Sequence, residues 1–167
     1  MSNKGSARVP VSTREAKEQA AEYFGFTASA YIRTENNKVF EIPNPAFLDD
    51  DQQERYDELM FVIEGCDREP DIEIPERTLE DGTVVPARTV EGDYKKPYRV
   101  DGELLKPNYT TRLAMALFGD DYAEFKAAGG SGNQVQLEWA RMNKEYADRL
   151  DSDSKSSGDA SPVEAVS

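Results

Sequence analysis

Prolines between residues 66 and 107 are the feature that most constrains the fold of this chain. They stand at Pro70, Pro75, Pro86, Pro97 and Pro107. Because proline lacks a backbone N–H and clashes with the preceding helical turn, they exclude a long helix from this segment. Asp81-Gly82 and Asp101-Gly102 each lie between two short β-prone runs, in TLEDGTVV and YRVDGELL. Asp-Gly pairs favour tight turns, so we predict two hairpins here.

Two arrangements of these hairpins are open. They could form a small sheet with an earlier hairpin, or they could form an extended arm that becomes ordered on a partner. Several prolines and many charges weaken a core over about 40 residues, and a loop of that length is typically functional or disordered. The arm is therefore the favoured alternative.

The segment before the prolines predicts a helix and then a hairpin. Ser12 and Glu15 fit a capping box, and Gly25 fits a C-terminal stop. The apolar stripe of this helix is thin and needs another element to cover it; it consists of Ala16, Ala20, Tyr23 and Phe24. The β-prone runs YIRT and VFEI then flank Asn36-Asn37, which tolerate left-handed turn geometry, and so predict a hairpin.

A strong helix is expected to begin at the acidic run Asp49 to Asp51 and to end at Gly65. Its apolar face follows the helical period and consists of Tyr56, Leu59, Met60 and Ile63. Three consecutive carboxylates at a helix start cannot all face one metal ion, and the alternating pattern of a calcium-binding loop is missing. We therefore assign the acidic run to helix capping and to the positive end of the helix dipole.

The C-terminal part of the sequence is helical in character. A first helix is expected to begin at Asn108 or Thr110 and to stop at Gly119. Its predicted apolar face consists of Leu113, Met115, Ala116 and Leu117. A short second helix precedes Gly129-Gly130, and a final helix follows at once. This pattern indicates a compact helical module.

The sequence as a whole predicts an α+β fold, with a small β-hairpin element, a helical C-terminal module and disordered termini. A single domain is expected over residues 12–150, with a hairpin-rich part at 66–107 and the helical module at 108–150. Residues 1–11 show no periodicity. Residues 151–167 carry almost no large apolar side chain, so they cannot offset the entropy of ordering themselves.

Charge limits the classes of partner. The chain has 33 acidic and 20 basic residues, for a net charge of -13, and 15 of the acids stand with only three bases between Glu41 and Asp81. This balance argues against nucleic acid and against anionic membrane surfaces as the main partner. The acidic run is either a solvated face or a docking site for a cationic protein, with the solvated face as the simpler interpretation.

The sequence also limits where in the cell the protein is expected to work. No run approaches the roughly 18 apolar residues that a membrane span needs, and the start MSNKGSARVPVST lacks the apolar core of a signal peptide. Cys66 is the only cysteine, so no intramolecular disulfide can form. We expect a soluble protein of a reducing cytoplasm.

The residue types argue against an enzyme. The chain has no histidine, which removes the usual general base and the commonest metal ligand. Cys66 therefore lacks a histidine to activate it. The run AGGSGN lacks both the spacing and the lysine of a phosphate-binding loop. We expect no catalytic residue, no cofactor and no metal site.

One group of side chains is a candidate partner-binding surface. It consists of Tyr122, Phe125, Trp139, Met142 and Tyr146. Such a stripe at helical spacing is more often core than binding groove. The alternative is a partly exposed groove or dimer face, since aromatic side chains dominate interface hot spots.

The order of segments resembles the tail assembly chaperones of long-tailed siphophages that infect actinobacteria. The resemblance spans residues 35 to 155 and rests on three stretches: KVFEIPNPAFLDDDQQERYDEL, DGTVVPARTVEGDYKKPYRVDGELLKP and LFGDDYAEFKAAGGSGNQVQLEWARMNKEY, followed by a serine- and aspartate-rich end. The resemblance lies in the order of the segments and in their local amino-acid sequence, and it includes no catalytic motif.

The resemblance implies a non-enzymatic helper in the host cell cytoplasm. Such proteins coat the tape measure protein, keep it soluble and help tail tube subunits polymerise around it. They coexist with a longer form made by ribosomal frameshifting, and they are absent from the mature virion. The expected partners are thus the tape measure protein, the longer form of this chain, the tail tube protein and further copies of the chain itself.

Two other functions are open. In a structural head-to-tail joining protein, the hairpins would grip neighbouring subunits, and purified particles would contain the protein at fixed stoichiometry. In an acidic inhibitor that mimics DNA, the carboxylates of residues 41–81 would be spaced like phosphates, and binding to the host protein would collapse with salt.

Overall fold

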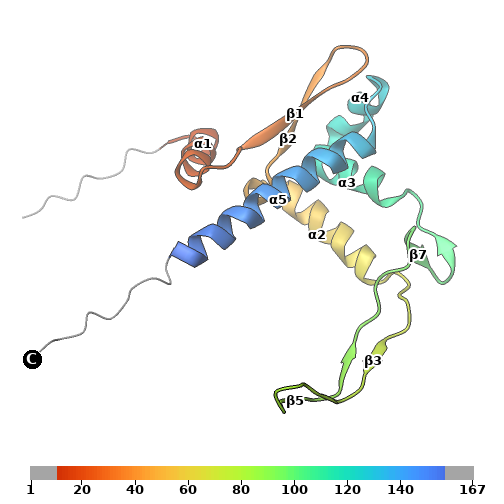
Figure 1. Ribbon diagram of the computed structural model, residues 1–167. Coiled ribbons are helices and arrows are strands. Elements are labelled where there is room, and N and C mark those ends of the chain that lie inside the picture. The colour runs from red at the N-terminus through yellow and green to blue at the C-terminus, as the bar shows by residue number, and fades with distance from the viewer. Residues whose placement is uncertain (1–10, 157–167) are drawn as a thin grey trace, which may run out of the picture.

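The computed structural model describes residues 11–156, and the disorder predicted for residues 1–10 and 157–167 lies outside this part of the chain. Helices α2, α3 and α5 lie at the centre of the described part, and a long β arm projects away from them (Figure 1). The fold is mixed α+β, as predicted. Within residues 11–156, the strands pair in antiparallel two-stranded ladders.

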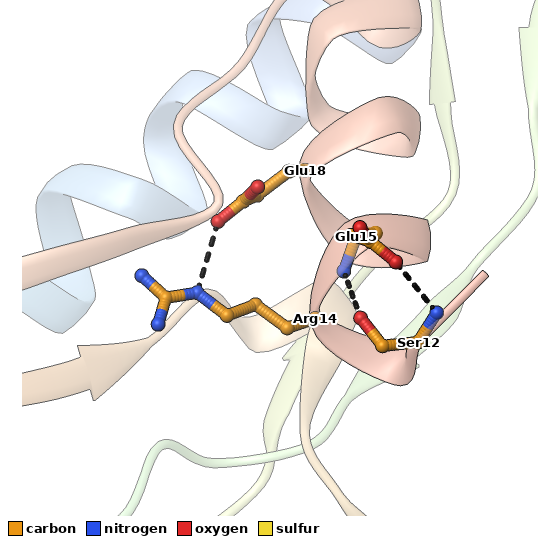
Figure 2. A network of polar contacts seen from close by, with 4 residues as sticks. All are labelled: Ser12, Arg14, Glu15 and Glu18. Carbon is orange, nitrogen blue, oxygen red and sulfur yellow. Dashed lines mark hydrogen bonds and ion pairs between the residues drawn. The ribbon is translucent and has the colours of Figure 1, made fainter.

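The first helix, α1 (Thr13–Phe24), lies between the predicted cap and the predicted stop. The Ser12 Oγ accepts a hydrogen bond from the Glu15 backbone N–H at 3.2 Å, and the Glu15 carboxylate accepts one from the Ser12 N–H at 2.8 Å. The bond from that backbone N–H lowers the pKa of Glu15. Figure 2 shows this capping box beside the Arg14–Glu18 ion pair.

The predicted first hairpin is confirmed. It pairs β1 (Ser29–Arg33) with β2 (Val39–Pro43) in antiparallel register. In its turn Asn37 has a φ of 63°, the left-handed geometry that asparagine tolerates. The Asn36 N–H donates to the Ala128 carbonyl at 3.3 Å, so the tip of the hairpin is anchored to the C-terminal module.

A 3-10 turn, η1 (Pro45–Phe47), leads into α2 (Asp50–Glu64). The Asp49 carboxylate accepts from the Gln52 backbone N–H at 2.8 Å, and the Gln52 side chain accepts from the Asp49 N–H at 3.1 Å. The assignment of the acidic run to helix capping is thus confirmed.

Both Asp-Gly hairpins of the middle segment are confirmed. β4 (Arg77–Thr78) pairs with β5 (Val84–Val85), and β7 (Arg99–Val100) pairs with β8 (Glu103–Leu104). A further ladder joins β3 (Ile72–Ile74) to β6 (Arg88–Val90) around the first of these hairpins. Among the described strands, none of these ladders pairs with β1 or β2, so the hairpins do not form one sheet.

The projecting arm covers residues 69–92, less than the predicted 66–107. Figure 1 shows this arm with β3 and β5 extending from the end of α2. Cys66 is buried in the core, and Tyr98 and Leu105 pack against the core cluster, so both ends of the predicted segment belong to the body. That the arm becomes ordered on a partner stays a prediction.

The arm is fixed at its base by Arg68. Its guanidinium lies 3.9 Å from the centre of the Tyr94 ring, donates to the Gly92 carbonyl at 3.1 Å and pairs with Glu91 at 3.2 Å. The Gly92 N–H in turn donates to the Asp71 carboxylate at 3.0 Å. The two chain segments therefore leave the body in a defined direction.

The helical module contains α3 (Tyr109–Phe118), the 3-10 turn η2 (Gly119–Asp121), α4 (Tyr122–Ala127) and α5 (Gly132–Ser156). The Asn108 side chain accepts from the Thr111 N–H at 3.0 Å, so of the two predicted caps Asn108 is the one used. Between α4 and α5, a Cβ at Gly130 would overlap the ring of Phe125. Glycine is therefore required at this close approach.

The predicted apolar face of α3 was wrong at one position. Met115 is 42% exposed, and Ala114 is buried in its place. Residues 113 and 115 lie about 200° apart around an α-helix. Because Leu113 faces the core, Met115 points away from it. The remaining face follows the prediction.

The core joins the first hairpin, α2 and the C-terminal module. Its buried members are Ala30, Ile32, Ile42, Leu59, Ile63, Cys66, Leu113, Ala114, Leu117, Phe125, Val135, Trp139 and Met142. Buried Asn44 ties the chain beside it by donating from its amide to the Thr27 carbonyl at 2.7 Å. These elements thus share one continuous core, and the single domain over residues 12–150 stays a prediction.

The predicted disorder from residue 151 onward is wrong for its first six residues, because α5 continues to Ser156. The Ser152 hydroxyl donates to the Asp148 and Arg149 carbonyls, both at 3.0 Å. Lys144 and Asp148 form an i,i+4 ion pair at 2.6 Å. The i,i+4 ion pair supports the exposed last turns, where apolar burial is lacking.

Candidate partner-binding site

An apolar groove runs between α2 and α3, with a volume of about 460 Å³. We call it the α2–α3 groove. Its apolar lining consists of Leu59, Val62, Pro107, Met115 and Ala116, and its charged and polar lining of Arg55, Glu58, Arg112, Asp120 and Tyr122. A hollow with an apolar floor and a charged rim is the form that receives the apolar face of an amphipathic helix.

Two side chains of α2 fix the position of α3. The Arg55 Nε donates to the Ala116 carbonyl at 2.7 Å, and the Gln52 amide donates to the Leu117 carbonyl at 3.2 Å. Both carbonyls belong to the last turn of α3, where no intrahelical N–H is available. The end of α3 is therefore held beside α2 by hydrogen bonds as well as by packing.

Gly119 ends α3 with a φ of 56°. A Cβ at this position would lie 2.9 Å from the guanidinium carbon of Arg55. The absence of a side chain lets Arg55 reach the end of α3, and the positive φ suits glycine. The predicted stop thus also shapes the groove.

A second hollow, which we call the acidic cleft, lies between β2, the start of α2 and the η2–α4 segment, with a volume of about 880 Å³. Its carboxylates are Glu41, Asp49, Asp51, Asp120, Asp121 and Glu124, and its cations are Lys17, Lys38 and Arg55. Lys38 and Glu124 pair at 2.7 Å. The cleft carries an excess of negative charge and suits cationic groups better than anionic ones.

Apolar rings lie within the acidic cleft. Phe40 and Phe118 both line it, and their ring centres are 5.9 Å apart in an edge-on arrangement. Phe118 in turn lies 4.6 Å from buried Phe125. The cleft therefore offers apolar contact beside its carboxylates.

The groove and the cleft share Arg55, Gly119 and Asp120 as lining residues. They consequently form one surface, apolar on the α2–α3 side and acidic on the β2 side. A helix with an apolar stripe flanked by lysine or arginine would be complementary to both parts.

Metal-ligating groups and perturbed side chains outside this surface complete the description of possible chemistry. Among residues 11–156, no group of three or more metal-ligating side chains is placed to hold a metal ion. Burial, followed by the charge of Asp67, raises the pKa of the Cys66 thiol, which disfavours the nucleophilic thiolate. Burial likewise raises the pKa of Tyr109 to about 12.

The five predicted partner-binding residues do not form one exposed surface. Phe125, Trp139 and Met142 are buried in the core, which was the simpler interpretation of their stripe. Tyr146 is half-buried and meets Phe26 at 5.6 Å, whereas Tyr122 lines the α2–α3 groove. Only Tyr122 therefore belongs to the candidate site.

Sequence reasoning missed Val62 and Met115 as site residues. A strict helical wheel would have found them, because both apolar side chains fall outside the buried stripes of their helices. A helical wheel describes one helix at a time, so it could not have predicted that α2 packs beside α3. That pairing brings the two side chains to one groove.

Comparison with protein-family models, with curated proteins and with solved structures yields no match. Within residues 11–156, none of the helices combines the length and the apolar character that a membrane crossing requires. The candidate function therefore rests on the resemblance of segments and on the geometry of the α2–α3 groove and the acidic cleft.

Proposed function

We propose that this protein is a non-catalytic tail assembly chaperone that binds the tape measure protein of a siphophage, keeps it soluble and promotes tail tube polymerisation. The observation that supports this function best is the junction of an apolar groove with an acidic cleft at Arg55, Gly119 and Asp120. A carrier for a long helical client needs apolar surface for the client and charge for solubility.

The client helix lies with its apolar stripe on Leu59, Val62 and Met115 and with its basic side chains toward the acidic cleft. The acids of α2 that face solvent keep the complex soluble through a high net negative charge. Binding of this kind is reversible, as a chaperone requires, because a groove of about 460 Å³ accepts only part of a helix at a time.

The protein acts in the host cell cytoplasm and is not retained in the mature virion. Its partners are the tape measure protein, a frameshifted longer form of this chain and the tail tube protein, and it also associates with itself. The C-terminal end of α5 lies away from α2 and α3 (Figure 1).

Replacement of Met115 tests the groove. The variant Met115→Asp places a carboxylate on the apolar lining of the groove and is expected to lower the amount of soluble tape measure protein at least about fivefold in co-expression, since covering this charge with the apolar face of the client opposes binding. The matched control is Leu137→Asp, at a methionine-sized apolar side chain that is 71% exposed on α5. Equal solubility with both variants would remove the groove from the mechanism.

A second experiment tests the biological assignment. The tagged protein is isolated from infected cells, and both the eluate and purified virions are analysed by mass spectrometry. Recovery of the tape measure protein, with no chaperone in virions, is expected. Stoichiometric presence in virions would instead support a head-to-tail joining protein, and recovery of a host nucleic-acid-binding protein alone would support a DNA mimic.

The joining protein is the second candidate because of the projecting arm. Residues 69–92 form an extended two-stranded structure that leaves the body in a defined direction. Arms of this shape can add a strand to a neighbouring subunit. Particle composition separates this function from the chaperone.

A further inference from the structure

Helix α1 is largely unsupported by the rest of the described chain. It has 12 residues, and Ala21 is its only buried side chain. Isolated helices of about 12 residues are marginal in water, and most helices in proteins are stabilised by packing of an apolar face. The apolar face of α1 therefore needs a packing partner. This face carries Ala16, Ala20, Tyr23 and Phe24.

The large side chains of this face are exposed but well supported. Tyr23 is 85% exposed and Phe24 is 52% exposed. Their rings meet edge-on at 5.1 Å, and Phe24 stacks on buried Phe26 at 5.8 Å. Phe26 in turn meets Tyr146 of α5 at 5.6 Å. Rings held in place by buried rings lose little freedom on binding and are typical interface anchors.

Charge favours contact between two copies at this face. Residues 11–28 carry two basic and three acidic side chains. Residues 41–81 carry three basic and 15 acidic side chains. Two chains of net charge -13 repel each other, so they can approach most easily at a nearly neutral surface. The Arg14–Glu18 pair on the first turns of α1 is itself neutral as a unit (Figure 2).

The face is also complementary to itself. Its small side chains, Ala16 and Ala20, stand in the first two turns, and its rings, Tyr23 and Phe24, stand in the last turn. When two such helices run antiparallel with a two-fold axis near Ala20, the rings of one copy lie over the alanines of the other. The opposed helix dipoles favour the same orientation.

We propose that α1 packs antiparallel against α1 of a second copy of this chain, with Tyr23 and Phe24 as the contact anchors. The dimer leaves the α2–α3 groove accessible and does not depend on the proposed chaperone function. A chain that dimerises but fails to bind the tape measure protein would contradict only that function.

The oligomeric state tests this interface. Sedimentation velocity of the wild type is expected to show a concentration-dependent dimer. The double variant Tyr23→Ser/Phe24→Ser is expected to raise the dimer dissociation constant at least about tenfold, as loss of two aromatic anchors does. The control Phe61→Ser removes another exposed ring, 77% exposed on α2, and is expected to leave the constant unchanged. Circular dichroism verifies that each variant is folded.

A cysteine cross-link tests the geometry independently. Cys66 is buried, so a cysteine placed at the surface reports its own surroundings. Oxidation of Ala20→Cys is expected to give a covalent dimer in high yield, whereas Leu137→Cys on α5 should not. A wild type that stays monomeric up to about 100 µM, equal dissociation constants for all variants, or equal cross-linking at both positions would each overturn the proposal.

Discussion

Arg55 contributes to two parts of the molecule at once. Its Nε satisfies the Ala116 carbonyl at 2.7 Å, and its side chain lines both the α2–α3 groove and the acidic cleft. The bond is possible because Gly119 leaves room for the guanidinium. At the scale of single residues, the site is therefore built by the same contacts that end α3.

Tyr109 gives the molecule a defined response to alkaline pH. Burial first, and then Tyr56 and Tyr98, raise its pKa to about 12 from an ordinary value of 10. Because the unfolded chain releases this proton first, the contribution of Tyr109 to stability is complete below pH 10 and is lost as pH rises to about 12. The ring is only partly buried, so solvent screening limits the loss to below about 2 kcal/mol.

Urea unfolding of the wild type and of Tyr109→Phe at pH 9 and at pH 11.5 measures this effect. The variant is expected to lose less stability than the wild type between the two pH values, with similar stability at pH 7. Parallel losses would show that Tyr109 titrates as it does in the unfolded chain.

At the scale of elements, local signals predicted boundaries well. The limits of α1 and α2 followed from Ser12, Glu15 and Asp49, because a cap depends on side chains within one turn of the helix start. The candidate site could not be predicted from these local signals, because it depends on contacts between residues far apart in the sequence. Gln52 and Arg55 bind carbonyls that are 65 and 61 residues away in the chain. No local pattern contains that relation.

The tip of the arm is expected to be dispensable for the fold of the body. Replacement of residues 75–87 by Asn-Gly joins Ile74 to Arg88 through a two-residue turn. These two residues already face each other across the β3–β6 ladder. The free energy of unfolding is expected to change by less than about 0.5 kcal/mol, because the removed side chains are mainly exposed. Urea unfolding followed by fluorescence of buried Trp139 measures it.

Asp67→Ala is the control for the arm. The Asp67 carboxylate accepts from the Asp101 N–H at 2.9 Å and from the Gly102 N–H at 2.7 Å, and so holds the β7–β8 turn to the body. Its removal is expected to lower stability by about 1–2 kcal/mol. A larger loss from the arm replacement than from Asp67→Ala would show that the arm supports the core.

At the scale of the whole molecule, negative charge is concentrated in one part of the chain. Most of the net charge of -13 belongs to residues 41–81, which include α2 and much of the arm, whereas α1 is nearly neutral. The proposed dimer face on α1 therefore lies in a nearly neutral part of the chain, and the proposed client groove lies beside the acidic part. The concentration of charge also implies that the folded state carries a repulsion that the expanded chain relieves.

Salt should therefore stabilise the protein. The Debye length falls from about 30 Å at 0.01 M salt to about 10 Å at 0.1 M, so sodium chloride screens repulsion among the carboxylates of α2. An increase in the free energy of unfolding on the order of 1 kcal/mol is expected over this range. The variant Glu54→Gln/Glu58→Gln/Glu64→Gln removes three of these charges and should show a smaller increase. If salt had the same effect on both proteins, or lowered stability, the acids of α2 would be compensated in the fold rather than repelling one another.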